Sequence, residues 1–132
     1  MSILANILLF AALSLPYTDI YIAPEPQISL IRNETPSLQN LIVSKAKQYN
    51  VDENKVMAIL NCESRFIPDA INTNTNGTKD YSYWQINSIH KNRALELGYD
   101  ILKPEDNLEF GFILLSTEGD RHWNSSKKCW KG

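Results

Sequence analysis

The sequence predicts a small α+β domain that is mostly helical and carries one antiparallel hairpin sheet. Apolar residues recur at helical spacing before residue 66 and again after residue 88. The stretch between them, 68–87, is rich in asparagine and threonine and contains Asn76-Gly77. Because Asn-Gly favours a type I′ turn, this stretch is expected to form the hairpin. The 132 residues suffice for one such domain and an N-terminal extension.

Two helices are predicted before the hairpin. Thr35 is the expected N-cap of the first helix, and Pro36 fits its first turn. This helix should run to about Tyr49 with one apolar face. A second helix should follow Asp52, a suitable N-cap, and end at Cys62 or Glu63. The apolar face of the first helix carries Leu38, Leu41, Ile42 and Ala46.

Two further helices are predicted after the hairpin. One covers Ser88–Leu97 and is ended by Gly98, and the next covers Pro104–Glu118 and is stopped by Gly119. The second of these places Asn107 and Gly111 beside its apolar face. The expected core residues of this region are Leu108, Phe112 and Leu115 on that helix, with Trp123 and Trp130 as packing anchors in the tail.

The N-terminal residues 1–17 have the length and apolar character of a signal peptide. No Lys or Arg precedes their apolar run and no A-x-A site follows it, so an uncleaved anchor that tethers the protein to a membrane stays open. Residues 18–34 contain Pro24 and Pro26 and are expected to be a linker. The domain itself should span residues 35–132, and we expect it to be exported.

The net charge of −2 gives no reason to expect a nucleic-acid partner. Two cysteines, Cys62 and Cys129, suit one disulfide in an exported protein. Closing a loop of this length stabilises a fold by roughly 4 kcal/mol in the chain-entropy treatment. The alternative is two free thiols in a cytosolic protein. The cysteines and histidines show no zinc-site spacing, so neither a metal nor another cofactor is expected.

Glu63 falls on the apolar stripe of the second helix, three to seven residues beyond Val56, Ile59 and Leu60. A carboxyl held against an apolar wall has a raised pKa, which suits a general acid near neutral pH. The alternative is a surface residue at the helix end, because the pattern breaks at Arg65. Position and residue type together make Glu63 the first candidate catalytic residue.

Asp80 is a second carboxylate, and its neighbours in the sequence are polar. Two acids in contrasting surroundings suit glycoside cleavage, in which one protonates the leaving oxygen and the other supports positive charge or attacks the sugar. That division of roles is the established one of lysozyme, the standard example of this chemistry. The alternative for Asp80 is a turn residue that accepts backbone hydrogen bonds.

Aromatic and amide side chains follow Asp80 and suit a sugar, which has apolar faces and a hydroxyl rim. Strand alternation would place Tyr81, Tyr83 and Gln85 on one side. Tyr83 or Trp84 could equally be a core residue. The candidate binding residues in this stretch are Tyr81, Tyr83, Gln85 and Asn87.

Four motifs in order resemble the lysozyme superfamily, and in particular the bacterial soluble-lytic-transglycosylase (SLT)-like domain. They are NCESRF at 61–66, NTNTNGTKDYSYWQINS at 72–88, PEDNLEFG at 104–111 and HWNSSKKCW at 122–130. The gap of seventeen positions between Glu63 and Asp80 is similar to that of animal-type lysozymes. The resemblance covers about residues 36–130 and implies a lysozyme-like fold with the hairpin sheet beside an active-site cleft.

The resemblance also implies residue roles. Glu63 becomes the general acid and base, and Asp80 matches the second acid of the hydrolytic branch. Ser64 becomes the partner of Glu63 at the helix end, within the substrate site. Gln85 and Asn107 become contacts to the glycan. Two departures stand out: Ser82-Tyr83-Trp84 replaces the usual Gly-Leu-Met, which is expected to reshape the cleft, and the late Tyr-Asn-Ala-Gly segment is missing. Trp123 is a candidate replacement for that tyrosine.

The predicted function is cleavage of the β-1,4 bond between N-acetylmuramic acid (MurNAc) and N-acetylglucosamine (GlcNAc) in peptidoglycan by a lytic transglycosylase. The alternative is a hydrolytic lysozyme that uses both Glu63 and Asp80. A third possibility, from another class, is a non-catalytic glycan-binding module. The expected partner is the glycan strand of peptidoglycan, and the protein is expected to act as a monomer outside the cytoplasm.

Overall fold

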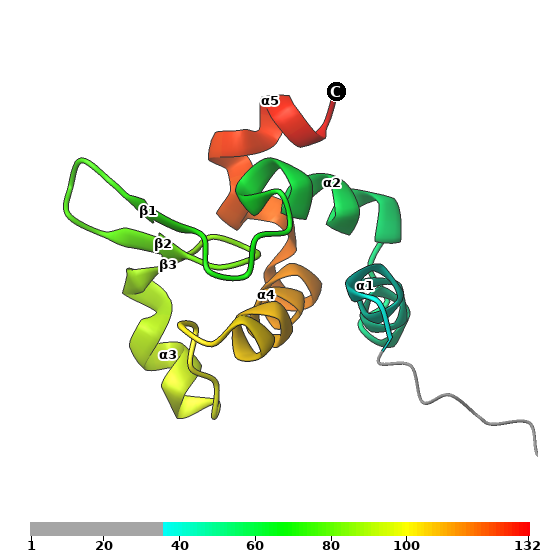
Figure 1. The fold of residues 1–132 in the computed structure, drawn as a ribbon, viewed down its shortest axis with the longest axis horizontal. Coiled ribbons are helices and arrows are strands. Elements are labelled where there is room, and N and C mark those ends of the chain that lie inside the picture. The colour runs from blue at the N-terminus through cyan, green and yellow to red at the C-terminus, as the bar shows by residue number, and fades with distance from the viewer. Residues whose placement is uncertain (1–35) are drawn as a thin grey trace, which may run out of the picture. The chain divides into compact units, whose positions relative to one another are not determined.

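Helix α4 (Pro104–Glu118) lies in the middle of the domain in this computed structural model, which describes residues 36–132 (Figure 1). It begins with Pro104 at its first position and carries Glu105 and Asp106 in its first turn, where acidic side chains interact favourably with the helix dipole. It ends at Gly119, whose φ of 72° suits glycine. Both predicted ends of this helix are therefore confirmed.

Helices α1 (Leu38–Gln48) and α2 (Glu53–Ser64) precede the sheet. The N-cap of α1 is Ser37, whose hydroxyl accepts a hydrogen bond from the Asn40 N–H at 3.3 Å, and not the predicted Thr35. Asp52 caps α2 as predicted, accepting from the Lys55 N–H at 2.9 Å. Helix α2 runs one residue past Glu63, and Arg65 then leaves the helix with a left-handed backbone (φ 53°).

Three short strands form an antiparallel sheet in the order β1 (Ile71–Thr73), β2 (Lys79–Tyr81) and β3 (Ile86–Asn87). The α+β, mostly helical class is thus confirmed. The predicted type I′ turn is wrong, because that turn needs a positive φ at both central residues and only Gly77 has one (82°). The loop spans residues 75–77 instead, and the Asn74 N–H donates across it to the Thr78 carbonyl at 2.8 Å.

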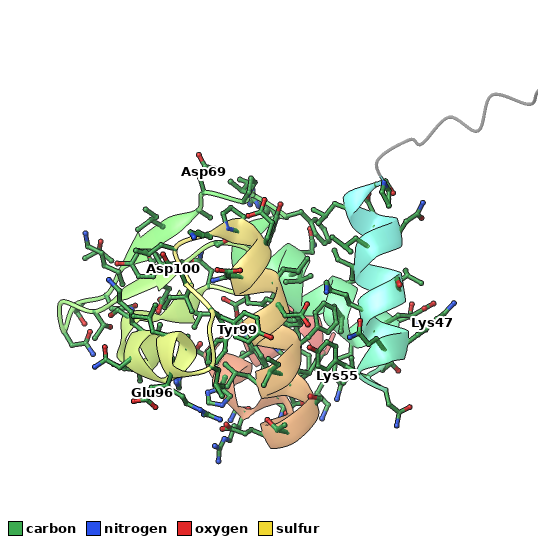
Figure 2. The ribbon with its side chains drawn as sticks, turned by 90° about the horizontal axis from the view of Figure 1, so that it is seen from below. Lys47, Lys55, Asp69, Glu96, Tyr99 and Asp100 are labelled. Atoms are coloured by element: carbon green, nitrogen blue, oxygen red, sulfur yellow. A yellow bond between two sulfur atoms is a disulfide. The ribbon has the colours of Figure 1, made fainter. Side chains whose placement is uncertain are left out.

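The predicted helix over 88–97 consists of two pieces, the 3₁₀ turn η1 (Ser88–His90) and helix α3 (Lys91–Glu96). The chain closes with a 3₁₀ segment η2 (Gly119–Ser126) and helix α5 (Lys127–Trp130). Figures 1 and 2 both show α1 on one side of α4 and the sheet with α3 on the other, and Lys47 of α1 points away from the domain. Within residues 36–132, no helix combines the length and apolar character that a membrane crossing needs.

Trp84 is the central side chain of the core. It is fully buried, its indole N–H donates to the Leu108 carbonyl at 3.0 Å, and its ring lies edge-on to Phe112 at 5.4 Å. A methyl group added at Gly111 would lie 2.1 Å from Trp84 Cδ1, so only glycine allows this approach. The predicted core residues of α4 and the tail are buried, namely Leu108, Phe112, Leu115, Trp123 and Trp130.

The predicted disulfide between Cys62 and Cys129 is present and joins α2 to α5. It connects positions 67 residues apart in the sequence, with Cα atoms separated by 6.0 Å. Because one of its cysteines immediately precedes Glu63, the bond attaches the C-terminal segment beside the candidate catalytic residue.

The Gly111→Ala variant should be less stable than the parent by about 1–3 kcal/mol, the usual cost of forcing extra volume into a packed core. The better helix propensity of alanine offsets at most about 1 kcal/mol. Urea unfolding followed by tryptophan fluorescence measures the difference. Ser116→Ala on the exposed side of the same helix is the matched control and should change stability by less than about 0.5 kcal/mol. Equal stability of the parent and Gly111→Ala would contradict the role given to this contact.

Candidate active site

A polar cleft of about 420 Å³ lies where the end of α2, the hairpin and η2 meet. Its walls carry the two candidate acids together with amides, histidines and one indole. Sequence-distant segments supply these groups, so only the folded chain brings them together. The lining residues that bear on function are Glu63, Asp80, Gln85, Asn87, His90, His122 and Trp123.

Glu63 lies in the last turn of α2, half-buried, one turn beyond the fully buried Ile59 and Leu60. Burial raises the pKa of its carboxyl, and the negative charge of Asp80 raises it further. The Ser126 hydroxyl donates a hydrogen bond to Glu63 Oε1 and acts in the opposite direction, lowering the pKa. The net result is a raised pKa, as the helical spacing predicted, and the side chain faces a cleft and not open solvent.

Asp80 occupies the central strand and lies opposite Asn72 of β1 and Asn87 of β3 in the sheet register. Its Oδ1 accepts from the Asn87 amide at 2.7 Å, and its Oδ2 accepts from Asn74 at 2.9 Å and from Asn72 at 3.3 Å. The donors are side-chain amides, not the backbone groups of a turn. Three amides therefore hold the Asp80 carboxylate in one orientation at the cleft.

The strand does not continue past Tyr81, so the predicted alternation of Tyr81, Tyr83 and Gln85 is wrong. Ser82 (φ 60°) and Gln85 (φ 48°) both have left-handed backbones and form a tight turn, with the Gln85 N–H donating to the Ser82 carbonyl at 3.1 Å. Ser82 stands where the resemblance leads one to expect glycine, which adopts such a φ without strain. This turn sends Trp84 into the core and brings Gln85 to the cleft.

Neither of the two bulky residues in the unusual Ser82-Tyr83-Trp84 segment lines the cleft. Trp84 is fully buried, and Tyr83 lines a separate pocket with Leu38 and Tyr99. The expectation that they reshape the cleft is therefore wrong. Their bulk fills the space on the other side of the turn.

Asn107 was expected to contact the glycan, and the structure places its side chain fully buried. Its amide N–H groups donate to the carbonyls of Tyr81 (2.8 Å) and Ile101 (3.1 Å). Its Oδ1 accepts from the backbone N–H of Trp84 at 3.2 Å. Asn107 thus ties α4 to the turn after β2 and leaves no group for a ligand.

Ser64 and Tyr81 also lie outside the cleft lining. Ser64 is buried, and its hydroxyl donates to the Tyr83 carbonyl at 2.8 Å, which joins the end of α2 to the turn. Tyr81 packs against the core from β2. Gln85, Asn87 and Trp123 do line the cleft, although the Trp123 indole N–H is used by the Trp84 carbonyl at 2.9 Å.

Sequence reasoning missed Ser126, His90 and His122. Ser126 contacts Glu63 across 63 positions of sequence, and no local pattern indicates such a contact. The histidines lie with their ring centroids 5.0 Å apart. His122 follows Glu118 by four residues, a spacing that could have indicated the hydrogen bond of 2.8 Å between them.

Among the described residues, no group of three or more His, Cys, Asp or Glu side chains could hold a metal ion. The side chains that line the cleft supply two carboxyl groups, amides and two imidazoles.

The mostly helical domain with a half-buried helix-end glutamate beside a small sheet defines the lysozyme-like class. The chain belongs to the transglycosylase SLT domain family, whose model matches residues 40–129. The predicted SLT-like membership is confirmed. The chain is also similar to Protein IpgF of Shigella flexneri and of Shigella sonnei, each 43% identical over 53 residues. Each match covers 40% of this chain and 35% of the relative.

The Glu63→Gln variant should gain stability over the parent as the pH rises from 4 to 8. The folded-state pKa of Glu63 lies above its unfolded value, so its stabilising contribution is complete below the unfolded pKa and is lost as the pH rises through the folded pKa. Glutamine does not titrate and avoids that loss. Urea unfolding at both pH values measures the effect, with Glu53→Gln in the exposed first turn of α2 as the control. A stability difference that does not change with pH would contradict the raised pKa.

Proposed function

We propose that the protein is a peptidoglycan lytic transglycosylase that cleaves the β-1,4 bond between MurNAc and GlcNAc, with Glu63 as both general acid and general base. The observation that carries this proposal is the half-buried Glu63 carboxyl with its raised pKa at the wall of a polar cleft. A raised pKa keeps the proton on the carboxyl near neutral pH, where general acid catalysis needs it. Membership of the transglycosylase SLT domain family supports the same reaction.

In the proposed reaction, protonated Glu63 first gives its proton to the bridging oxygen, and the bond from that oxygen to MurNAc C1 breaks. The GlcNAc fragment leaves with the proton as its hydroxyl. Glu63, now a carboxylate, then removes the proton from the MurNAc C6 hydroxyl as O6 attacks C1. A 1,6-anhydro ring closes, Glu63 is protonated again, and no water is consumed. Ser126 can orient the carboxyl through both steps because it donates to Oε1 only.

The second candidate is hydrolysis, and the position of Asp80 at the same cleft favours it. In that reaction Asp80 supports positive charge at the sugar while water completes the cleavage. The three amides that donate to Asp80 favour a role as a fixed charge over attack on the sugar, because their hydrogen bonds occupy its oxygens.

We propose that Gln85 and Asn87 contact the glycan, since both line the cleft. Trp123 supplies an apolar surface in the cleft and would take the role of the tyrosine in the missing Tyr-Asn-Ala-Gly segment. Ser64, Tyr81 and Tyr83 would then act by holding the turn that presents Gln85.

The proposed substrate lies in the cell envelope, so we propose that the protein is exported and acts there as a monomer. The predicted signal peptide or membrane anchor (1–17) and linker (18–34) lie outside the residues that the structure describes.

Incubation of the protein with purified peptidoglycan should release fragments with 1,6-anhydro-MurNAc ends, identified by mass spectrometry. Glu63→Gln should lower the rate by at least about 10²-fold, the smaller end of what a general acid contributes. Glu53→Gln should keep the parent rate. Fragments with reducing ends would show that the enzyme is a hydrolase and not a transglycosylase. Glycan binding without any turnover would show that the protein is a non-catalytic binding module.

Asp80→Asn separates the two enzymatic candidates by rate. Under the transglycosylase proposal the variant should retain activity within about tenfold, because the proton chemistry belongs to Glu63 alone and the substitution removes only a charge effect. A loss approaching that of Glu63→Gln would favour the two-acid hydrolase. Circular dichroism of the variant checks that the sheet, in which Asp80 accepts three hydrogen bonds, is retained.

A further inference from the structure

We infer that the end of the cleft formed by His90 and His122 is an anion subsite, which takes a carboxylate carried by the muramic acid units of the substrate. This inference rests on the proposed function and adds to it a determinant of how the glycan strand is positioned. Neither histidine has a part in the proton chemistry proposed for Glu63.

The two histidines come from different elements and meet at the cleft wall. His90 ends η1 and His122 lies in η2, and the rings contact edge to face. Both line the same cleft as Glu63 and Asp80. His122 is held in place on its other sides by Glu118 and by the ring of Trp123 at 5.9 Å.

A cluster with excess positive charge lies behind this pair. The Glu118 carboxylate pairs with Arg93 at 2.5 Å and with Arg121, in addition to its contact with His122. Hydrogen bonds from Arg93, His122 and Arg121 lower the pKa of Glu118 to about 2, so it carries one negative charge at neutral pH. Two guanidinium groups face this one carboxylate, which leaves the cluster with a net positive charge even when both histidines are neutral.

His90 offers a free hydrogen-bonding group beside this cluster. Within residues 36–132 its ring nitrogens make no hydrogen bond to the protein, and the ring is partly exposed to the cleft. Burial lowers the pKa of His90, and the charges of His122, Arg93 and Arg121 lower it further against the opposing effect of Glu118. The neutral ring can therefore donate an N–H to an anion while the arginines behind it supply the attraction.

The same cleft also carries the two carboxyl groups of Glu63 and Asp80. Glu63 becomes a carboxylate when it gives up its proton. A glycan with a carboxylate on one sugar in two is therefore repelled beside these two acids and attracted at the histidines. MurNAc carries this group, as a free lactyl carboxylate or through the carboxylates of a stem peptide, whereas GlcNAc has none. The charge pattern would thus determine which sugar lies on which side of the cleaved bond.

The test measures binding by calorimetry in the Glu63→Gln background, where no turnover occurs. Three tetrasaccharides are compared: neutral GlcNAc₄, peptide-free (GlcNAc-MurNAc)₂, and the same (GlcNAc-MurNAc)₂ bearing stem peptides. The two acidic ligands should bind more tightly than the neutral one. Adding His90→Phe, which keeps a ring against His122 but removes the nitrogens, should reduce this preference by about tenfold, the size of one hydrogen bond to a charged group.

Arg121→Gln is a second variant, at an exposed side chain, and should reduce the same preference by weakening the positive cluster. Lys91→Gln removes an exposed positive charge next to His90 in sequence but outside the cleft lining, and should leave the preference unchanged. Whichever acidic ligand loses more affinity identifies the source of the carboxylate, the lactyl group or the peptide.

The inference is overturned if His90→Phe weakens all three ligands equally, or if Lys91→Gln reduces the preference as much as His90→Phe does. It is also overturned, while the proposed function stands, if the parent releases anhydro-ended fragments but the Glu63→Gln protein binds neutral and acidic ligands equally. Absence of binding to any of the three, together with absence of turnover in the parent, would reject the proposed function itself.

Discussion

The close approach of Trp84 to Gly111 is the contact on which the rest of the site depends. The absence of a side chain at Gly111 lets the indole lie against α4. Asn107 on the same helix accepts a hydrogen bond from the backbone N–H of Trp84. The Trp84 carbonyl in turn accepts from the indole of Trp123. One residue thus joins the turn after β2 to α4 and to η2. Because this turn follows the strand that carries Asp80 and ends with Gln85, its position determines where these two cleft residues lie.

The raised pKa of Glu63 results from opposing effects, one of them local to its helix and the others from distant parts of the sequence. Burial at the end of α2 is a local consequence of where the residue falls on the helix, and Asp80 adds a negative charge from the sheet. Ser126 opposes both by donating a hydrogen bond. The disulfide of Cys62 and Cys129 attaches the segment that carries Ser126 next to Glu63. The C-terminal segment, which looks like a simple tail in the sequence, therefore belongs to the site.

The cleft is lined by two chemically distinct sets of groups. One set is the carboxyl groups of Glu63 and Asp80. The other is the histidine pair, next to which Glu118 is paired with two arginines. In a reaction that passes through positive charge on a sugar, acids at the cleavage point stabilise the developing charge. A separate basic region can hold an acidic substrate without neutralising these acids. Binding and chemistry would thereby use different parts of one cleft.

Features that depend on local spacing along the chain were predictable from the sequence. The limits of α4, the Asp52 cap and the place of Glu63 on an apolar stripe follow from helix geometry, and the structure confirms the disulfide that the two cysteines suggested. Three further features follow from how distant segments pack. The strand stops at Tyr81, backbone groups take up the hydrogen bonds of Asn107, and Ser126 contacts Glu63 while the two histidines line the cleft. These features depend on contacts between segments far apart in the chain, whose geometry is set by how the core packs and not by the period of any single helix or strand.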